Sequence, residues 1–233
     1  MIRKLSPAKI NLCLRVLGKR EDGYHDIASL MQRISLADEM FFAPSTGGIT
    51  VRCPGSPLPE NEGNIVYRAA EALFSDAGCH RGIDITIHKK IPIAAGLGGG
   101  SSNAATTLMT MNEIFALRYP AEDLMKIGAK LGADVPFFIF QKTAWAFGIG
   151  ERLEAADLLP PFWLVLINPG FELSTKMIYE GLKLRLTNRT IHYSIPRFYT
   201  IHDLAEGLQN DLERVSVRIH PVLAELKRLL ISH

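Results

Sequence analysis

Apolar and polar positions alternate with a period of two near the start of the chain. The apolar set is Ile10, Leu12, Leu14 and Val16. This period is typical of a strand with one face in the core, so Lys9 and Asn11 share the opposite face. The pattern alone favours exposure of that face to solvent.

Ligand binding is the alternative role for the Lys9 face. A turn at residues 18–23 returns the chain to Tyr24 and His25. These two side chains can stack on a ligand and hydrogen-bond to it. They can equally form a half-buried pair at a strand edge, and the residues alone leave both interpretations open.

The same alternation predicts further strands. Residues 27–42 form a strand with a turn at 37–39, and shorter strands follow at 49–53 and 83–87. The apolar run at 162–167 has the length of another strand.

Apolar residues three and four positions apart predict the helices. Three such segments lie at 103–117, 121–131 and 222–230, and a shorter helix is capped near Ser174. A further helix begins after Asn64, whose side-chain oxygen can accept from the first turn. Its apolar stripe is Val66, Ala69, Ala70, Leu73 and Phe74.

Composition narrows the class of protein. The chain has 233 residues, 47% of them hydrophobic, which is enough for one large core or two modest ones, and we favour two. The net charge of +2 demands neither a nucleic acid nor an anionic membrane as partner.

The cysteines and the apolar runs point to a cytoplasmic protein. Cys13, Cys53 and Cys79 are widely separated and form no C-x-x-C motif, so neither a disulfide framework nor a zinc site is predicted. A reducing cytoplasm is the simplest setting. The first residues lack a long apolar segment, so we expect no signal peptide, and no apolar run reaches the length of a membrane span.

A glycine-rich loop at 92–103 is the strongest chemical signal in the sequence. It holds four glycines within five positions and opens directly into the predicted helix at 103–117. Glycine allows positive φ and close approach of main-chain N–H groups to a ligand. A helix that begins at such a loop directs its free N–H groups and partial positive charge at that ligand. The combination predicts a phosphate site.

Two better-known phosphate loops fit this segment poorly. A P-loop requires a Lys after its last Gly, and Gly100 is followed by Ser-Ser-Asn. A dinucleotide-binding loop requires a third Gly where Ser101 stands. A flexible linker is the alternative, but the adjoining residues are too helix-prone and too apolar for a linker.

Asp134 is the second chemical signal. It stands between Ala133 and a Val-Pro-Phe-Phe run that is typical of a core. A carboxylate in that setting requires a partner or is costly to bury. A lone Asp at such a place is more often a helix cap than a catalytic base, and the residues alone do not decide between the two.

Three separated segments together resemble the GHMP family of small-molecule kinases. They are residues 7–12 with 18–25, the glycine loop 92–103, and residues 131–137. The resemblance runs through nearly the whole chain. It implies an α+β, two-domain fold, with a ribosomal-protein-like ATP-binding and catalytic domain at 1–152 and an incomplete ferredoxin-like domain at 153–233.

The resemblance also implies an activity and a set of site residues. The reaction would transfer the γ-phosphoryl group of ATP, with Mg²⁺, to the 2-hydroxyl of a cytidine-diphosphate-linked methylerythritol in non-mevalonate isoprenoid precursor biosynthesis. Asp134 would take the proton from that hydroxyl, Lys9 would orient the carboxylate, and Ser102 would lie near Mg²⁺. The ATP-binding residues would be Asn64 on the adenine side and, in the loop, Pro92, Gly96, Leu97, Gly98, Gly99, Gly100, Ser101, Ser102 and Asn103.

Five residues would contact the substrate by the same resemblance. Asn11, Tyr24 and His25 would meet the cytidine and the diphosphate, Tyr179 would stack on the cytosine, and Thr175 would lie near them. We expect a small-molecule substrate, no nucleic-acid or membrane partner, and a monomer or weak homodimer.

One departure from the family pattern concerns the end of the sequence. Family members carry a further Gly-Ser-Gly-like loop and an apolar strand beyond the helix at 222–230, and this sequence stops at His233 without them. We therefore expect a truncated product whose full activity and stability are in doubt.

Three rival functions follow from the same residues. The first is a sibling kinase acting on homoserine, mevalonate or a sugar, and the second is an inactive nucleotide-binding regulator. The third is an RNA-binding module, which the small net charge and the absence of a basic stripe with interleaved aromatics argue against.

Overall fold

The computed structural model describes residues 1–156, 159–171, 173–182, 184, 193–196, 198 and 200–232. Its contacts divide the chain into two units. The first comprises Met1–Ile10, Gln32–Ile93 and Leu97–Lys142, and the second comprises Asn11–Met31, Ala94–Gly96 and Thr143–His233. The two longest strands contribute residues to both units, and a domain boundary at residue 152 stays a prediction.

Four strands build the sheet of the first unit in the order β3-β4-β2-β1. They are β1 (Ile2–Lys19), β2 (His25–Ser45), β3 (Ile49–Arg52) and β4 (Gly82–His88). The pair β2 and β4 is antiparallel, whereas β3 and β4 are parallel. The strands predicted at 49–53 and 83–87 are confirmed, because their alternating apolar residues face the core.

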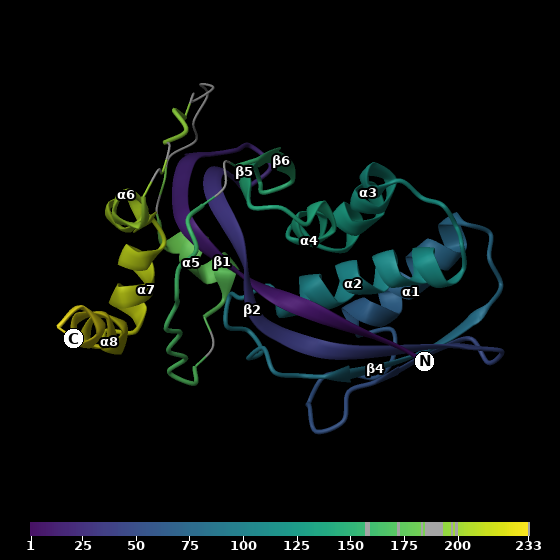
Figure 1. The fold of residues 1–233 in the computed structure, drawn as a ribbon. Coiled ribbons are helices and arrows are strands. Elements are labelled where there is room, and N and C mark those ends of the chain that lie inside the picture. The colour runs from purple at the N-terminus through teal and green to yellow at the C-terminus, as the bar shows by residue number, and fades with distance from the viewer. Residues whose placement is uncertain are drawn as a thin grey trace. The chain divides into compact units, whose positions relative to one another are not determined.

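Four helices of the first unit gather on one side of these strands (Figure 1). They are α1 (Ile65–Asp76), α2 (Gly99–Ile114), α3 (Ala121–Leu131) and α4 (Val135–Phe140). The predicted stripe of α1 is buried in full, and Asn64 caps this helix by accepting from the Val66 N–H at 2.9 Å. Burial of this apolar stripe, more than intrinsic helix propensity, stabilises α1.

The turn predicted at residues 37–39 is wrong. Strand β2 continues through this segment, and Asp38 within it is fully buried. Its Oδ1 accepts from the main-chain N–H groups of Lys90 at 2.7 Å and Ile91 at 2.9 Å, and its Oδ2 pairs with the Lys89 ammonium. Residues 37–39 resemble a turn in the sequence because Asp38 is polar. Its partners lie far along the chain, so the sequence pattern does not show that Asp38 is buried within a strand.

The second unit contains the remaining strands and helices. Strand β5 (Ala144–Gly148) is antiparallel to the start of β2 and to β6 (Arg152–Ala155), and β7 (Gln209–Asn210) is parallel to β1 at Cys13 and Leu14. The helices are α5 (Thr175–Gly181), α6 (Ile201–Gly207), α7 (Glu213–Ile219) and α8 (Val222–Ile231). The helices predicted near Ser174 and at 222–230 are thus confirmed.

In the described part of the chain, every helix is too short or too polar to cross a membrane.

The strand predicted at residues 162–167 is absent from the described structure. Trp163 in this run is fully exposed, and Val165 is 74% exposed. A strand requires a neighbour that pairs with its main-chain groups, and none of the described strands pairs with this segment. Apolar composition alone therefore gave the wrong prediction here.

Candidate active site

The glycine loop ends where α2 begins. Gly98 occupies the N-cap position in the left-handed region with φ of +68°, and Gly96 also has positive φ. No acidic residue lies in the first turn of α2, so no side chain of that turn neutralises the partial positive charge at the start of the helix. This geometry suits a phosphate chain, as the sequence predicted.

Lys9 and Asp134 meet in the first unit. The Lys9 Nζ lies 3.5 Å from the Asp134 Oδ2, and the side chains are 9% and 36% exposed. Asp134 stands at the N-cap position of α4, but its side chain makes no capping hydrogen bond. The cap interpretation of Asp134 is therefore wrong, and its carboxylate pairs with the ammonium of Lys9.

Lys9 is also attached to the glycine loop. Its main-chain N–H donates to the Leu97 carbonyl oxygen at 2.9 Å. A Cβ at position 98 would lie 3.0 Å from the Lys9 Cγ. The solvated face favoured for Lys9 by periodicity is therefore wrong, since the loop covers this part of β1.

A buried hydrogen-bond network supports the start of α2, and no local sequence pattern predicts it. Asn103 donates through Nδ2 to Asp38 at 3.0 Å and to the Ser6 hydroxyl at 2.9 Å. Ser6 in turn donates to the Ser102 hydroxyl at 2.8 Å. Because Ser6 uses its proton on Ser102, the proton of Ser102 itself is available for another acceptor. Each link joins segments distant in sequence, which is why the pattern along the chain could not show it.

Both the oxygen and the nitrogen of the Asn64 side-chain amide make hydrogen bonds that stabilise the fold. Its Oδ1 caps α1, and its Nδ2 donates to the Pro59 carbonyl at 2.7 Å. The adjoining Ile65 lies beside the glycine loop, 3.7 Å from where a Cβ at Gly100 would stand. The predicted adenine contact of Asn64 stays a prediction.

The residues predicted to contact substrate lie in the second unit. The rings of His25 and Tyr179 stack with centroids 5.1 Å apart. Asn11 donates through Nδ2 to the Ser29 hydroxyl at 2.7 Å, and Tyr24 is exposed. Thr175 begins α5 with its main chain, but its side chain lies outside the described part of the structure.

The electrostatics of His25 favour its neutral form. Burial lowers the pKa of its imidazole, and the nearby positive charge of Lys19 lowers that pKa further. A neutral imidazole can both donate and accept a hydrogen bond. Such a group suits the polar edge of a base or a sugar hydroxyl.

The first-unit site can therefore do two things chemically. The loop and the start of α2 can hold an anionic phosphate chain, and the Asp134 carboxylate beside the Lys9 ammonium can accept a proton from an alcohol.

Comparison with known proteins gives a consistent result. Residues 64–142 match the family described as GHMP kinases N terminal domain. The whole chain is 61% identical to the 4-diphosphocytidyl-2-C-methyl-D-erythritol kinase of Syntrophus aciditrophicus and covers 84% of that protein. It is 53% identical to the enzyme of the same name from Syntrophotalea carbinolica, over 98% of this chain and 81% of the relative.

Solved structures agree with the sequence matches. A crystal structure of 4-(cytidine 5'-diphospho)-2C-methyl-D-erythritol kinase is 35% identical, with a TM-score of 0.76 over 97% of this chain and 81% of that one. The homoserine kinase of Cytophaga hutchinsonii is 19% identical with a TM-score of 0.57, over 80% of this chain and 61% of that one, and shares the fold.

Proposed function

The chain belongs to the 4-diphosphocytidyl-2-C-methyl-D-erythritol kinases of the GHMP kinase family, and from this we propose that it phosphorylates that substrate with ATP. The acceptor is the 2-hydroxyl of the methylerythritol, and the product feeds isoprenoid precursor biosynthesis. The observation that carries the proposal is the Lys9–Asp134 pair beside the amide-rich start of α2.

The chemistry assigns one role to each part of the site. Phosphoryl transfer depends mostly on positioning and on stabilising charge. The main-chain N–H groups from Gly98 to Ser101 hold the triphosphate, whereas the Ser102 N–H donates to the Gly98 carbonyl oxygen at 2.9 Å. Asp134 accepts the proton of the attacking hydroxyl. Lys9 orients the Asp134 carboxylate and stabilises negative charge that develops during transfer.

Magnesium is the cation we propose for this site. Among the described residues, no three or more His, Cys, Asp or Glu side chains cluster to hold a metal ion. Mg²⁺ is commonly held by one or two protein oxygens together with substrate phosphates and water. The Ser102 hydroxyl accepts one hydrogen bond, from Ser6, and keeps a second lone pair. This donor set fits Mg²⁺ held mainly by the triphosphate, where the ion would neutralise phosphate charge.

The second-unit residues are proposed to bind the cytidine diphosphate. Tyr179 offers an aromatic face for the cytosine, and His25 offers a neutral imidazole beside it. Asn11 and Tyr24 provide polar groups, and Thr175 is assigned by the resemblance alone.

Gly98→Ala is expected to lower kcat/KM by about tenfold or more, because a displacement of about 1 Å in a site can cost about 10²-fold. The added Cβ would lie 3.0 Å from the Lys9 Cγ and from the Phe138 ring, at a backbone φ that disfavours Ala. Steady-state kinetics with ATP measure this change.

Gly96→Ala is the matched control for this variant. Gly96 also has positive φ, but a Cβ there would meet no atom within 4 Å. Equal losses in the two variants would contradict the argument, because backbone strain would then account for both.

The free energy of unfolding is expected to decrease as the pH falls below neutral, and His25 should contribute part of that decrease. Because burial lowers its pKa, the unfolded chain binds the His25 proton more readily as pH drops below the ordinary value of about 6.5. We expect His25→Gln to show a smaller decrease in Tm between about pH 7.5 and 5.5 than the wild type. His80→Gln, at an exposed position, is the control. A decrease unchanged by His25→Gln would show that His25 does not contribute.

A coupled ADP-release assay tests the function directly. We expect ADP release with 4-diphosphocytidyl-2-C-methyl-D-erythritol and none above background with homoserine, mevalonate or galactose. ADP release with only homoserine, only mevalonate or only galactose would show that the protein is a kinase of that compound instead. Tight ATP binding without ADP release on any of them would indicate an inactive nucleotide-binding relative.

A cytoplasmic location is also proposed. Cys13, Cys53 and Cys79 are all free thiols, which suits a reducing compartment. Burial raises the pKa of the Cys13 and Cys53 thiols, so both stay protonated and unreactive. A monomer or weak homodimer stays a prediction.

A further inference from the structure

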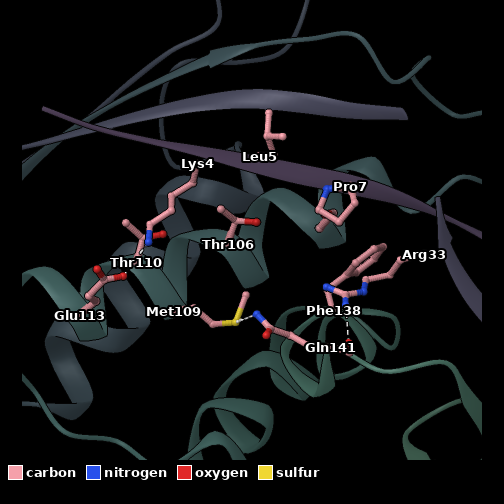
Figure 2. Close-up of a pocket in the computed structure, with 11 residues that line it drawn as sticks. Lys4, Leu5, Pro7, Arg33, Thr106, Met109, Thr110, Glu113, Phe138 and Gln141 are labelled. Carbon is pink, nitrogen blue, oxygen red and sulfur yellow. Dashed lines mark hydrogen bonds and ion pairs between the residues drawn. The ribbon is translucent and has the colours of Figure 1, made fainter. Parts of the chain in front are cut away.

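The first unit contains a cavity whose lining does not include the Lys9–Asp134 pair. It has a volume of about 200 Å³ and opens between the start of β1, the side of α2 and the end of α4 (Figure 2). Its polar lining residues are Lys4, Arg33, Ser102, Thr106, Thr110, Glu113 and Gln141. Neither Lys9, Gly98 nor Asp134 lines it.

One face of α2 supplies hydroxyl groups to this cavity. Ser102, Thr106 and Thr110 recur every fourth residue, so they lie one above another on the helix. Thr106 is 5% exposed and Thr110 is 2% exposed, and Figure 2 shows both side chains pointing from α2 toward β1.

Thr106 and Thr110 make no side-chain hydrogen bond to any residue that the structure describes. The proton of Ser102 is likewise available, because Ser102 accepts from Ser6. No fully buried polar side-chain atom lacks a partner among the described residues, so the Thr106 and Thr110 hydroxyl groups open onto the cavity that they line. A polar occupant of the cavity would satisfy them.

The cavity also carries one uncompensated positive charge. Lys4 is neutralised by Glu113 at 2.7 Å. Arg33 donates to the main-chain oxygen of Gln141, as the dashed line in Figure 2 marks, and pairs with no carboxylate among the described residues. Burial lowers the pKa of the Arg33 guanidinium, since its charge has lost water without gaining a counterion. An anion placed beside Arg33 would restore that balance.

We propose that this cavity binds a small tetrahedral oxyanion of the phosphate class. A guanidinium presents planar N–H groups that match phosphate oxygens, and one of its nitrogens already fixes the Arg33 side chain through Gln141. The hydroxyl groups of Thr106 and Thr110 donate to further oxygens of the same anion. The volume admits a single phosphate group or a small phosphorylated compound and excludes a nucleotide.

The glycine loop is a separate anion site, and Phe138 lies between the two. The Phe138 ring lines the cavity, and it would also stand 3.0 Å from a Cβ at Gly98. Ser102 borders both sites, since it lines the cavity and also belongs to the proposed triphosphate site. The proposed anion is additional to the nucleotide, and the inference goes beyond the kinase reaction.

Isothermal titration calorimetry with inorganic phosphate tests this site. The protein is first saturated with Mg²⁺ and a non-hydrolysable ATP analogue, so that the glycine loop is occupied, and ionic strength is held constant. We expect one saturable phosphate site. Arg33→Gln and Thr110→Val are each expected to raise the Kd for phosphate at least about tenfold. Arg52→Gln, at an exposed position on β3, is expected to leave the Kd unchanged.

Three results would overturn the proposal. These are no saturable phosphate binding by the wild-type protein, binding that disappears when the ATP analogue is present, and a Kd unchanged in both pocket variants. Thr110→Val keeps the shape of the side chain and removes only its hydroxyl. If Arg33→Gln fails to fold, Thr110→Val and Thr106→Val decide the question.

Discussion

Replacing Asp134 with asparagine is expected to lower kcat by about 10²- to 10⁴-fold, the range that a well-placed base contributes, while ATP affinity changes by only a few-fold. Asparagine keeps the size of the side chain but cannot accept the proton of the attacking hydroxyl. The main-chain groups that hold the phosphates at the start of α2 are unaffected by the change. Steady-state kinetics measure kcat, and calorimetry with ATP measures the Kd.

The structure supplies a matched control for this experiment. Asp123 is a carboxylate on α3 that pairs with Lys126 at 2.7 Å near the surface, and Asp123→Asn should keep full activity. The Asp134 variant also leaves the nearly buried Lys9 ammonium without its counter-charge, so Tm must be measured alongside. A folded Asp134→Asn protein with kcat within tenfold of the wild type would remove Asp134 from the role of base.

Replacing Asp38 with alanine is expected to lower the free energy of unfolding by about 3–5 kcal/mol, the usual effect of breaking a buried ion pair. The Asp38 carboxylate is fully buried and accepts from two main-chain N–H groups, from Asn103 and from Lys89. Its loss leaves those donors unsatisfied and the Lys89 charge uncompensated. Urea denaturation of the variant and the wild type measures the difference.

A second substitution separates the charge from the hydrogen bonds. Adding Lys89→Met to the Asp38 variant removes the uncompensated ammonium, and we expect it to recover part of the lost stability. Asp123→Ala is the surface reference and should cost less than about 1 kcal/mol. If Asp38→Ala costs no more than that reference, the buried network is not a main source of stability.

Local signals in the sequence predicted most elements of the first unit. Asn64 caps α1 as expected, and α3 spans the predicted residues 121–131. The glycine loop opens into α2 with Gly98 at positive φ. In each case the signal comes from residues a few positions apart, so it is visible in the amino-acid sequence alone.

Long-range partners explain what the sequence could not predict. Asp38 resembled part of a turn because its partners come from Lys89, Lys90 and Asn103. The alternation around Lys9 predicts a solvated face, because the glycine loop that covers Lys9 comes much later in the sequence. The proximity of Lys9 to Asp134 came only from the family resemblance, since no spacing along the chain encodes it.

Insertions and deletions should be rare along β2 in the evolutionary history of this protein. The strand runs without interruption from His25 to Ser45, and side chains alternate between its two faces at every residue. One added residue between His25 and Asp38 would turn one of them to the wrong face. Divergence in this stretch should therefore proceed by substitution, and length changes should collect in the turns between Arg52 and Asn64.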